Sequence, residues 1–420
     1  MKDTLLARIE RDRDLLIAFL RDFVRCRSPN PPGDTVQAAD FVRRTLRERG
    51  IEFEEIAPVA DRPNFIATFD TGRPGPHLVL NGHIDVFPVE SEDGWTKDPW
   101  GGELVDERIY GRGACDMKCG TTASIFTFLY LNEIRDRLRG RLTLTVVSDE
   151  ESFSPPGMRH LMDHHREKVL GDVCLNGEPS SPYTVRFGEK GPIWGRFTAR
   201  SKGGHGAFVH MSRNAILVAM EAIAELRDLP NRIPVTEDAD LARALDEAGP
   251  DLDRAYGPGA AKIIRQLTIN IGRIKGGVKV NMIAAEYTFE ADIRVPNGAS
   301  FEAVKAEIDA IAKRHSLEMD LFTASPPNWR EPFHPLMDIV RANAALLKPG
   351  LVPARVVSPG ATDARLWRLN GVPAVVYGPS PHGMGSVDEN VSLDEFFHVV
   401  KSHVLSAFDY LSRTGVRGAG

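Results

Sequence analysis

The sequence predicts an α/β protein in two parts: an α/β sandwich with a mostly parallel sheet, and an inserted domain with the βαββαβ order of a ferredoxin-like fold. The chain has 420 residues, which is too long for one ordinary core. Strand patterns alternate with helix patterns in its first part, and a strand and a helix pattern return at its end. Near residue 190 this order changes, and we therefore expect a second domain inserted into the first.

The first part of the chain predicts two helices and then a sheet. Charged residues separate apolar ones from Leu5 to Phe23, which is typical of an amphipathic helix. A break rich in proline and glycine follows, and a second helix runs to Gly50. The later segments are predicted, in order, as strands 64–69 and 77–87, helix 121–134, strand 141–151, helix 157–169 and strand 172–178. Strand 77–87 is almost continuously apolar, which indicates a central strand buried on both faces.

The inserted domain is predicted from six segments in βαββαβ order. They are strand 192–201, helix 214–229, strands 267–275 and 282–294, helix 301–315 and strand 318–322. An acidic insert at 231–258, with proline and glycine, is expected to be a surface excursion. A strand at 371–378 and a closing helix at 394–411 return to the first fold. The expected domains are therefore 1–189 with 327–420, and 190–326.

Composition excludes several classes of function. Apolar residues make up 42% and charged residues 26%, and 58 acidic against 52 basic side chains give a net charge of −6. Nothing in this balance indicates a nucleic-acid or membrane surface. No apolar run approaches the ~20 residues of a membrane span. Four scattered cysteines do not form a disulfide framework, and a cytoplasmic protein is expected.

Side chains capable of chemistry fall where the predicted strands end. His83 and Asp85 lie two apart at the end of one strand, so both point the same way. Such a pair either holds a cation or merely lies in a loop. Asp116 lies among glycines just before a helix, where it either approaches a bound species or caps the helix. Cys115 and Cys119 lack zinc-site spacing and are expected to be small buried residues.

Further carboxylates follow the next strands. Asp149, Glu150 and Glu151 stand in a row, and such carboxylates repel one another unless solvent or a cation compensates. Glu178 ends the following strand. A ligand cluster at one edge of a parallel sheet is predicted because four residues share this position. They are His83, Asp116, Glu151 and Glu178. Imidazole and oxygen donors without thiolate suit Zn²⁺, Mn²⁺ or Co²⁺.

These stretches together resemble the M20 metallopeptidase family. The stretches that carry the resemblance are GPHLVLNGHIDVFPV, GRGACDMKCG, SDEES, NGEPS, GGHGAFVHMSRNAI and ADIRVP. They are ordered along nearly the whole chain. The resemblance implies a catalytic α/β domain with an inserted lid that commonly forms the interface of a homodimer. It also implies one or two divalent ions per chain.

The resemblance implies a role for each matching residue. His83, Asp116, Glu151 and Glu178 would be metal ligands, with Asp116 bridging two ions. Asp85 would orient His83, and Glu150 would be the general base. His205 would reach the partner's active site and stabilise the oxyanion, unless it is a surface residue of a glycine-rich loop. Arg294, Asn281, Thr362 and Asp363 would contact substrate, although Arg294 could instead form a salt bridge in the lid.

One position departs from the family pattern. The family's last ligand is a histidine three residues before an acidic pair, here Asp388 and Glu389, and Gly385 stands in its place. His382 lies three residues earlier in a glycine-rich loop. It could replace the missing ligand, or the second ion could be lost, or His382 could merely line the pocket.

The expected function is metal-dependent hydrolysis of an amide-type C–N bond in a small carboxylate-bearing substrate, such as an N-acyl amino acid or a dipeptide. The glycine at 385 favours a member distant from the biosynthetic deacylases. Two alternatives stay open. One is a catabolic enzyme that uses one metal on a non-peptide C–N bond, for example in an amino-aromatic acid. The other is a non-catalytic binding protein, against which an intact Glu150 argues.

Overall fold

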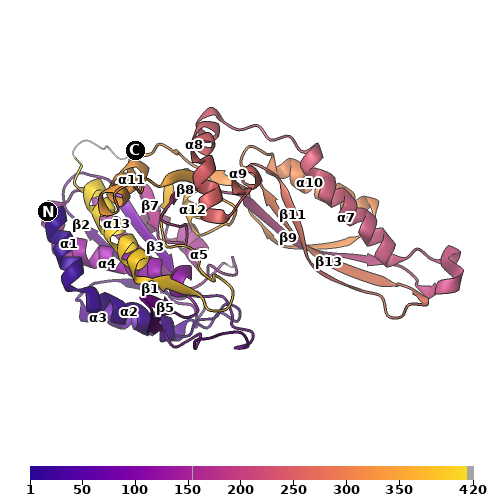
Figure 1. Ribbon diagram of the computed structural model, residues 1–420, viewed down its shortest axis with the longest axis horizontal. Helices are drawn as coiled ribbons and strands as arrows, with labels where there is room; N and C mark the ends of the chain where they lie inside the picture. The colour runs from indigo at the N-terminus through magenta and orange to yellow at the C-terminus, as the bar shows by residue number, and fades with distance from the viewer. Residues whose placement is uncertain (154, 414–420) are drawn as a thin grey trace.

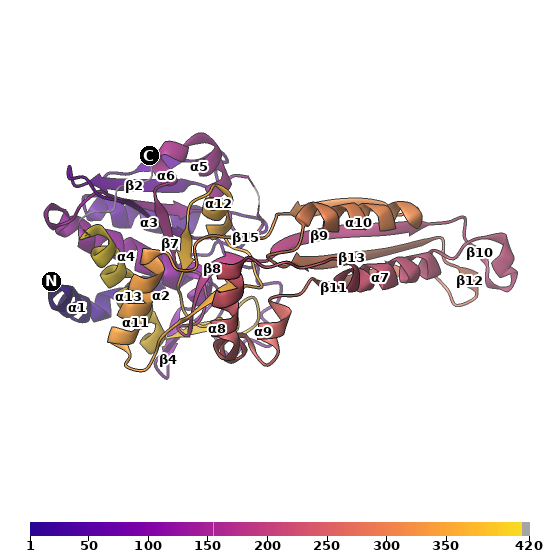
Figure 2. The same cartoon turned by 90° about the horizontal axis from the view of Figure 1, so that it is seen from above.

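The computed structural model describes residues 1–153 and 155–413. Its ribbon shows a large α/β part that contains the N-terminus and the last helix, α13, and a long lid that projects from one side (Figure 1). Seen from above, the lid extends far from the α/β part, and β10 and β12 lie at its tip (Figure 2). The expected α/β class and the second domain are confirmed.

A nine-stranded mixed sheet forms the centre of the α/β part. The strands are β1 (Glu54–Ile56), β2 (Asn64–Asp70), β3 (His77–His83), β6 (Arg141–Val147), β7 (Val173–Asn176), β8 (Thr184–Glu189), β15 (Asn328–Trp329), β16 (Ala354–Ser358) and β17 (Ala374–Val376). The central strands β6, β3, β7 and β17 are parallel neighbours. β1 with β2, β2 with β6, and β15 and β17 with β8 pair antiparallel. β16 pairs parallel with β8. Parallel pairing is thus found at the centre of the sheet and again between β8 and β16, and the other pairs are antiparallel.

Helices cover both faces of this sheet. One face carries α1 (Lys2–Arg11), α2 (Arg13–Arg25), α3 (Val36–Glu48), α4 (Cys119–Glu133), α11 (Pro335–Leu347) and α13 (Leu393–Leu411). The other carries α5 (Met158–His164), α6 (Arg166–Val169) and α12 (Ala364–Leu369). Along β3, Leu78 and Leu80 pack into the first core and Val79 into the second. The continuous apolar run therefore marks a strand buried on both faces, as predicted. The amphipathic segment at the N-terminus is two helices that meet at Asp12.

The lid contains a four-stranded antiparallel sheet in the order β11-β13-β9-β14. Its elements are β9 (Gly191–Arg200), α7 (Ala215–Arg232), β11 (Thr268–Gly276), β13 (Glu286–Val295), α10 (Phe301–Arg314) and β14 (Glu318–Ala324). This is the predicted βαββαβ order. The helices α7 and α10 pack on the sheet around a separate apolar core. At the tip, the short strands β10 (Gly204–His205) and β12 (Met282–Ile283) pair beside a 3-10 helix, Gly206–Met211.

The acidic insert of the lid is not a surface excursion, which corrects the expectation from sequence. It forms α8 (Ala239–Tyr256) and α9 (Ala260–Ile263), and α8 packs against β16 and β8 of the α/β part. Leu241, Leu245 and Leu252 belong to the main core there. Apolar residues recur along α8 at helical spacing, and this pattern is typical of a helix with one buried face. The proline and glycine of the same segment are instead typical of a surface loop.

A small sheet of β4 (Glu103–Val105), β5 (Arg108–Tyr110) and β18 (Asn390–Ser392) joins the acidic pair to the α/β part. No helix within residues 1–153 and 155–413 is long and apolar enough to span a bilayer.

Candidate metal centre and active site

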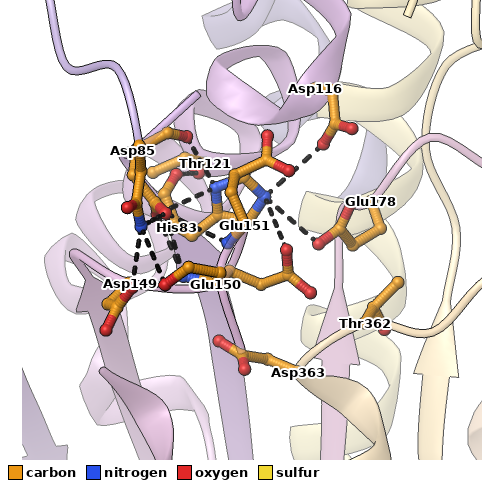
Figure 3. A network of polar contacts seen from close by, with 12 residues as sticks. His83, Asp85, Asp116, Thr121, Asp149, Glu150, Glu151, Glu178, Thr362 and Asp363 are labelled. Carbon is orange, nitrogen blue, oxygen red and sulfur yellow. Dashed lines mark hydrogen bonds and ion pairs between the residues drawn. The ribbon is translucent and has the colours of Figure 1, made fainter. Parts of the chain in front are cut away.

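Polar side chains gather where the central strands end. His83 is the last residue of β3, Glu150 and Glu151 follow β6, and Glu178 follows β7. Asp116 lies in the turn before α4. Figure 3 shows these side chains converging on one small space. Parallel strands that end at one edge explain this convergence, because they deliver side chains from distant parts of the sequence to the same place.

Three of these residues have the geometry of a metal site. His83, Asp116 and Glu178 each offer one ligand atom, and these atoms lie within 4.8 Å of one another. His83 Nε2 is 3.4 Å from Asp116 and 3.3 Å from Glu178. The other ring nitrogen, Nδ1, lies 2.8 Å from the backbone carbonyl of Asp85 and can donate to it. That contact favours the tautomer whose Nε2 is free to bind a cation.

Unsatisfied polar atoms support a cation at this place. Five buried atoms of this cluster have no hydrogen-bond partner in the described part of the chain, although buried polar groups are normally paired. They are His83 Nε2 and one carboxylate oxygen each of Asp116, Glu150, Glu151 and Glu178. The donor set fits a divalent ion, because such an ion would satisfy atoms that otherwise face one another without compensation.

The electrostatics of the cluster point the same way. Burial, together with the Asp116 carboxylate, raises the pKa of Glu178 to about 7. Burial and then Glu178 raise the pKa of Glu150 well above its usual range, and burial and then Asp116 do the same for Glu151. Burial alone would lower the pKa of His83, but Glu178 and Asp116 raise it. The metal-free cluster therefore retains protons that a divalent cation would displace.

The Asp85 carboxylate holds the turn that carries the acidic pair. It accepts hydrogen bonds from the backbone N–H groups of Glu150 and Glu151, at 3.0 and 3.1 Å, and from the Asn30 amide at 2.8 Å. The Asp85 carboxylate lies 3.4 Å from His83 Nδ1, whereas the Asp85 backbone carbonyl lies only 2.8 Å from the same nitrogen. Asp85 therefore orients His83 mainly through its backbone, and its side chain positions Glu150.

Glu389 holds the turn that carries Asp116 through hydrogen bonds to its backbone. Its buried carboxylate accepts from the backbone N–H groups of Cys115 and Asp116, both at 3.1 Å, and pairs with Arg112 at 2.5 Å. The peptide bond between Asp116 and Met117 is cis. Cys115 and Cys119 are buried free thiols, as expected. The glutamate of the acidic pair thus acts on a metal ligand through the backbone.

A close approach of two glycines brings α4 next to the residue before Glu178. A Cβ atom at Gly120 would lie 2.1 Å from the carbonyl oxygen of Gly177. No side chain fits at that distance, so glycine is required there. This contact fixes how closely α4 and the end of β7 approach, and with it the distance between Asp116 and Glu178.

A cavity of about 450 Å³ lies beside the cluster, between the α/β part and the lid. Its wall includes Glu150, Glu178, Thr362 and Arg294. Thr362 donates at 2.6 Å to the buried carboxylate of Glu189. Asp363 is buried near the site, and burial raises its pKa to about 6.

Arg294 faces the cavity with its charge already compensated. Its guanidinium pairs with Asp292 at 2.7 Å and lies over the Trp194 ring, 5.2 Å from the ring centre. The sequence left two roles open for Arg294, a substrate contact and a salt bridge. The salt bridge is present, and Arg294 also forms part of the cavity wall.

His205 and Asn281 lie at the tip of the lid, apart from the other candidates. Both are exposed. His205 belongs to β10 and Asn281 directly precedes β12, and both strands lie far from the α/β part in Figure 2. His205 Nδ1 accepts from the backbone of Ala207, and the Asn281 carbonyl accepts from Gly206. Within one chain, the structure does not bring these residues to the metal ligands.

His382 is also apart from the three ligands. Its side chain is 47% exposed, and its ring lies 3.9 Å from Glu395. Gly385 has φ +69°, and a Cβ atom added there would lie 3.7 Å from the Phe87 ring. Phe87 and the neighbouring Met384 line the cavity. Apolar groups thus stand beside the position where the family pattern has a histidine.

Sequence reasoning missed two arginines near the site. Arg365 lies 3.8 Å from Glu150 and 3.7 Å from Asp363. Arg186, on β8, lines the cavity. Arg365 stands two residues after a predicted site residue, and that proximity was the available signal. Arg186 lies in a strand with no motif around it, so no signal pointed to it.

Comparisons with known proteins identify the family. The model of peptidase family M20/M25/M40 matches residues 79–407. The chain belongs to the M20 peptidase family. A succinyl-diaminopimelate desuccinylase of Cereibacter sphaeroides is 30% identical over 390 residues, which cover 90% of this chain and 94% of the relative. One from Rhodospirillum centenum is 30% identical over 397 residues, with 91% and 94% covered.

Solved structures of M20 proteins share the fold. A metallo-carboxypeptidase of the M20 family from Sulfolobus solfataricus gives a TM-score of 0.80 at 16% identity, covering 94% of this chain and 99% of that one. Human carnosine dipeptidase 1 gives 0.73 at 16% identity, covering 98% and 100%. With the metal site described above, the M20 chain is a metal-dependent amidohydrolase, which confirms the expected enzyme class.

Proposed function

We propose that this M20 enzyme hydrolyses an amide-type C–N bond in a small carboxylate-bearing substrate, such as an N-acyl amino acid or a dipeptide. Relatives named desuccinylase, carboxypeptidase and dipeptidase support an amide-type bond. The observation that carries the proposal is the position of Glu150. Its carboxylate lies 4.0 Å from His83 Nε2, borders the cavity, and has one buried oxygen with no hydrogen-bond partner in the described chain.

Different residues of the chain would bind the metal and transfer the proton. His83, Asp116 and Glu178 would hold Zn²⁺, Mn²⁺ or Co²⁺, which when bound supplies Lewis acidity at the scissile carbonyl and at the attacking water. Glu150 takes the proton of the water and passes it to the leaving nitrogen. Its raised pKa suits the first step, because a stronger base accepts the proton of the water more readily. Arg365, 3.8 Å away, keeps the ionised form accessible.

Replacement of Glu150 tests this mechanism. The Glu150→Ala enzyme, loaded with Mn²⁺, Zn²⁺ or Co²⁺, should bind as much metal as wild type and lose turnover of N-acyl amino acids and dipeptides by at least about 100-fold. Glu52→Ala, at an exposed position, is the matched control. An active Glu150→Ala enzyme would refute the role of Glu150. No turnover by fully loaded wild type on amides or amino-aromatic acids would favour a binding protein instead.

We also propose that one divalent ion occupies each chain, on His83, Asp116 and Glu178. Glu151 could bind a second ion, but that ion would need a further ligand from the segment around Gly385. Gly385 has no side chain to offer, and the exposed His382 lies beside Glu395. Elemental analysis should give one ion per chain in both wild type and His382→Ala. Gly385→His should raise the content toward two. Loss of one of two ions in His382→Ala would instead establish His382 as a ligand.

A second copy of the chain is proposed to cover the tip of the lid. Large apolar side chains are exposed there, which is typical of an interface. They are Phe208 (55%), Val209 (73%), Met211 (70%), Val278 (91%) and Val280 (100%). His205 and Asn281 lie among them and would serve the partner's site. Mixing inactive His205→Ala with inactive Glu150→Ala should restore activity in mixed dimers, and no recovery would count against this arrangement.

The cellular location is proposed to be the cytoplasm, where the four free thiols would stay reduced.

A further inference from the structure

Arg186 is the exception among the buried arginines of the described chain. Four arginines are at most 7% exposed. Arg112 pairs with Glu389, Arg365 with Glu150 and Asp363, and Arg368 with Glu189, all within 4 Å. No carboxylate in residues 1–153 or 155–413 lies within that distance of Arg186. A buried guanidinium without an anion is costly, so it indicates a ligand.

Neighbouring groups fix the Arg186 side chain without neutralising it. Its Nε donates to the Tyr256 hydroxyl at 3.0 Å, and its guanidinium lies 5.6 Å from the centre of the Tyr256 ring. The Tyr256 hydroxyl in turn donates to the Ser180 carbonyl at 3.2 Å and lies 3.3 Å from Thr184. Within the described chain, the two terminal nitrogens of Arg186 have no hydrogen-bond acceptor. One edge of the guanidinium is therefore held, and the other stays available for an anion.

The open edge belongs to the catalytic cavity. Arg186 and Tyr256 line the same cavity as Glu150 and Glu178. The other arginine there, Arg294, already pairs with Asp292. The cavity wall is otherwise rich in apolar and aromatic side chains. They are Phe87, Phe153, Trp194, Pro359, Ala361 and Met384. A ligand that satisfies both features has a carboxylate and an apolar body.

We propose that Arg186 binds the substrate carboxylate, as a bidentate pair through its two terminal nitrogens, with Tyr256 as its positioning residue. This rests on the proposed amide hydrolysis and names its substrate class: acids whose carboxylate lies on the Arg186 side and whose apolar group contacts the aromatic wall. A planar guanidinium matches a carboxylate better than a point charge does. The helix α8, which the lid contributes to the α/β part, thus supplies a specificity element through Tyr256.

Binding can be measured apart from turnover in the full-length, Zn²⁺-loaded Glu150→Ala protein. The probes are N-benzoylglycine, N-benzoylphenylalanine and N-succinylphenylalanine, each beside the analogue whose amino-acid carboxylate is a carboxamide. Calorimetry should show the acids binding more tightly than the carboxamides. Adding Arg186→Met should weaken the acids by about 10- to 100-fold and leave the carboxamides nearly unchanged. Adding Arg294→Met, the matched control, should weaken both forms alike and by less.

Stability separates this role from a structural one. If Arg186 serves ligand binding and not folding, the Arg186→Met protein without ligand should melt at the same temperature as the parent protein or higher. N-benzoylglycine should then raise the melting temperature only of the protein that keeps Arg186. A structural role predicts a lower melting temperature instead. Tyr256→Phe keeps the charge and should weaken the acids by a smaller factor.

Three results would overturn the proposal. They are no binding of any acid to the parent protein at 10 mM, equal loss of acid and carboxamide binding in Arg186→Met, and unchanged acid binding in that variant. Failure of the proposed hydrolysis would look different, because acids would bind selectively while wild type would turn over none of them.

Discussion

Replacing Glu178 by glutamine should stabilise the metal-free protein at high pH and weaken the metal-loaded one. The folded pKa of Glu178 is about 7, against an ordinary value of 4.5. A group whose folded pKa is raised in this way costs stability as pH rises from the unfolded to the folded pKa, because the folded state then holds more protons. The difference corresponds to about 3 kcal/mol. Glutamine has no charge to bury, so the metal-free variant should gain up to that amount above pH 7 and nothing at pH 4.5.

The comparison must be made between variants, because other groups titrate in the opposite sense. Burial lowers the pKa of four histidines to about 4, so their contribution to stability is lost as pH falls below 6.5. They are His77, His334, His398 and His403. Both proteins share them, and their effect cancels in the difference.

The assay is urea unfolding of chelator-treated protein at pH 5, 6, 7 and 8, repeated with Zn²⁺. Glu52→Gln, at an exposed position, is the matched control and should follow wild type at every pH. With Zn²⁺ the order should reverse, because glutamine offers a neutral oxygen where the ion binds a carboxylate. A metal-free Glu178→Gln protein that is no more stable than wild type at pH 8 would refute the argument from buried charge.

Three further predictions concern the supports of the site. Arg368→Met should destabilise the protein by roughly 3–5 kcal/mol in urea, because it leaves the buried charge of Glu189 unpaired, and a loss below 1 kcal/mol would contradict this. Gly120→Ala should lower the melting temperature and the zinc affinity by forcing α4 away from Gly177, whereas Gly249→Ala, with open space around it, should do neither. Glu389→Gln should weaken zinc binding by roughly 10-fold in equilibrium dialysis, and unchanged affinity would remove its role in holding the Asp116 turn.

The metal ligands were predictable because of how they are encoded. Each follows a strand or precedes a helix, and in a parallel sheet those ends meet at one edge. Their side chains meet at that edge because β6, β3 and β7 are neighbours in the sheet, an order that the sequence does not state. The role of Glu389 was not predictable, because its carboxylate acts on backbone N–H groups more than 270 residues away in sequence.

The substrate side was harder to predict, since it is assembled from segments that share no pattern. Arg186 comes from a buried strand, Tyr256 from the end of an insert, and Trp194 from the lid. Local patterns show that α8 is amphipathic but not which surface its apolar stripe covers. The acidic residues, proline and glycine of the insert predicted a surface excursion, although the insert packs against β8 and brings Tyr256 to Arg186.

Charge pairing explains why the arginines divide into structural and functional ones. An arginine that holds the fold must be neutralised within the chain, as Arg368 is by Glu189, because an unpaired buried charge would cost several kcal/mol. An arginine that binds an anionic substrate must not be fully neutralised, because the anion would then have to displace a resident carboxylate. Arg294 meets the first condition through Asp292, and Arg186 meets the second. The family resemblance implied either a substrate contact or a salt bridge for Arg294, whereas charge balance in the folded cavity favours Arg186 as the residue that binds the carboxylate.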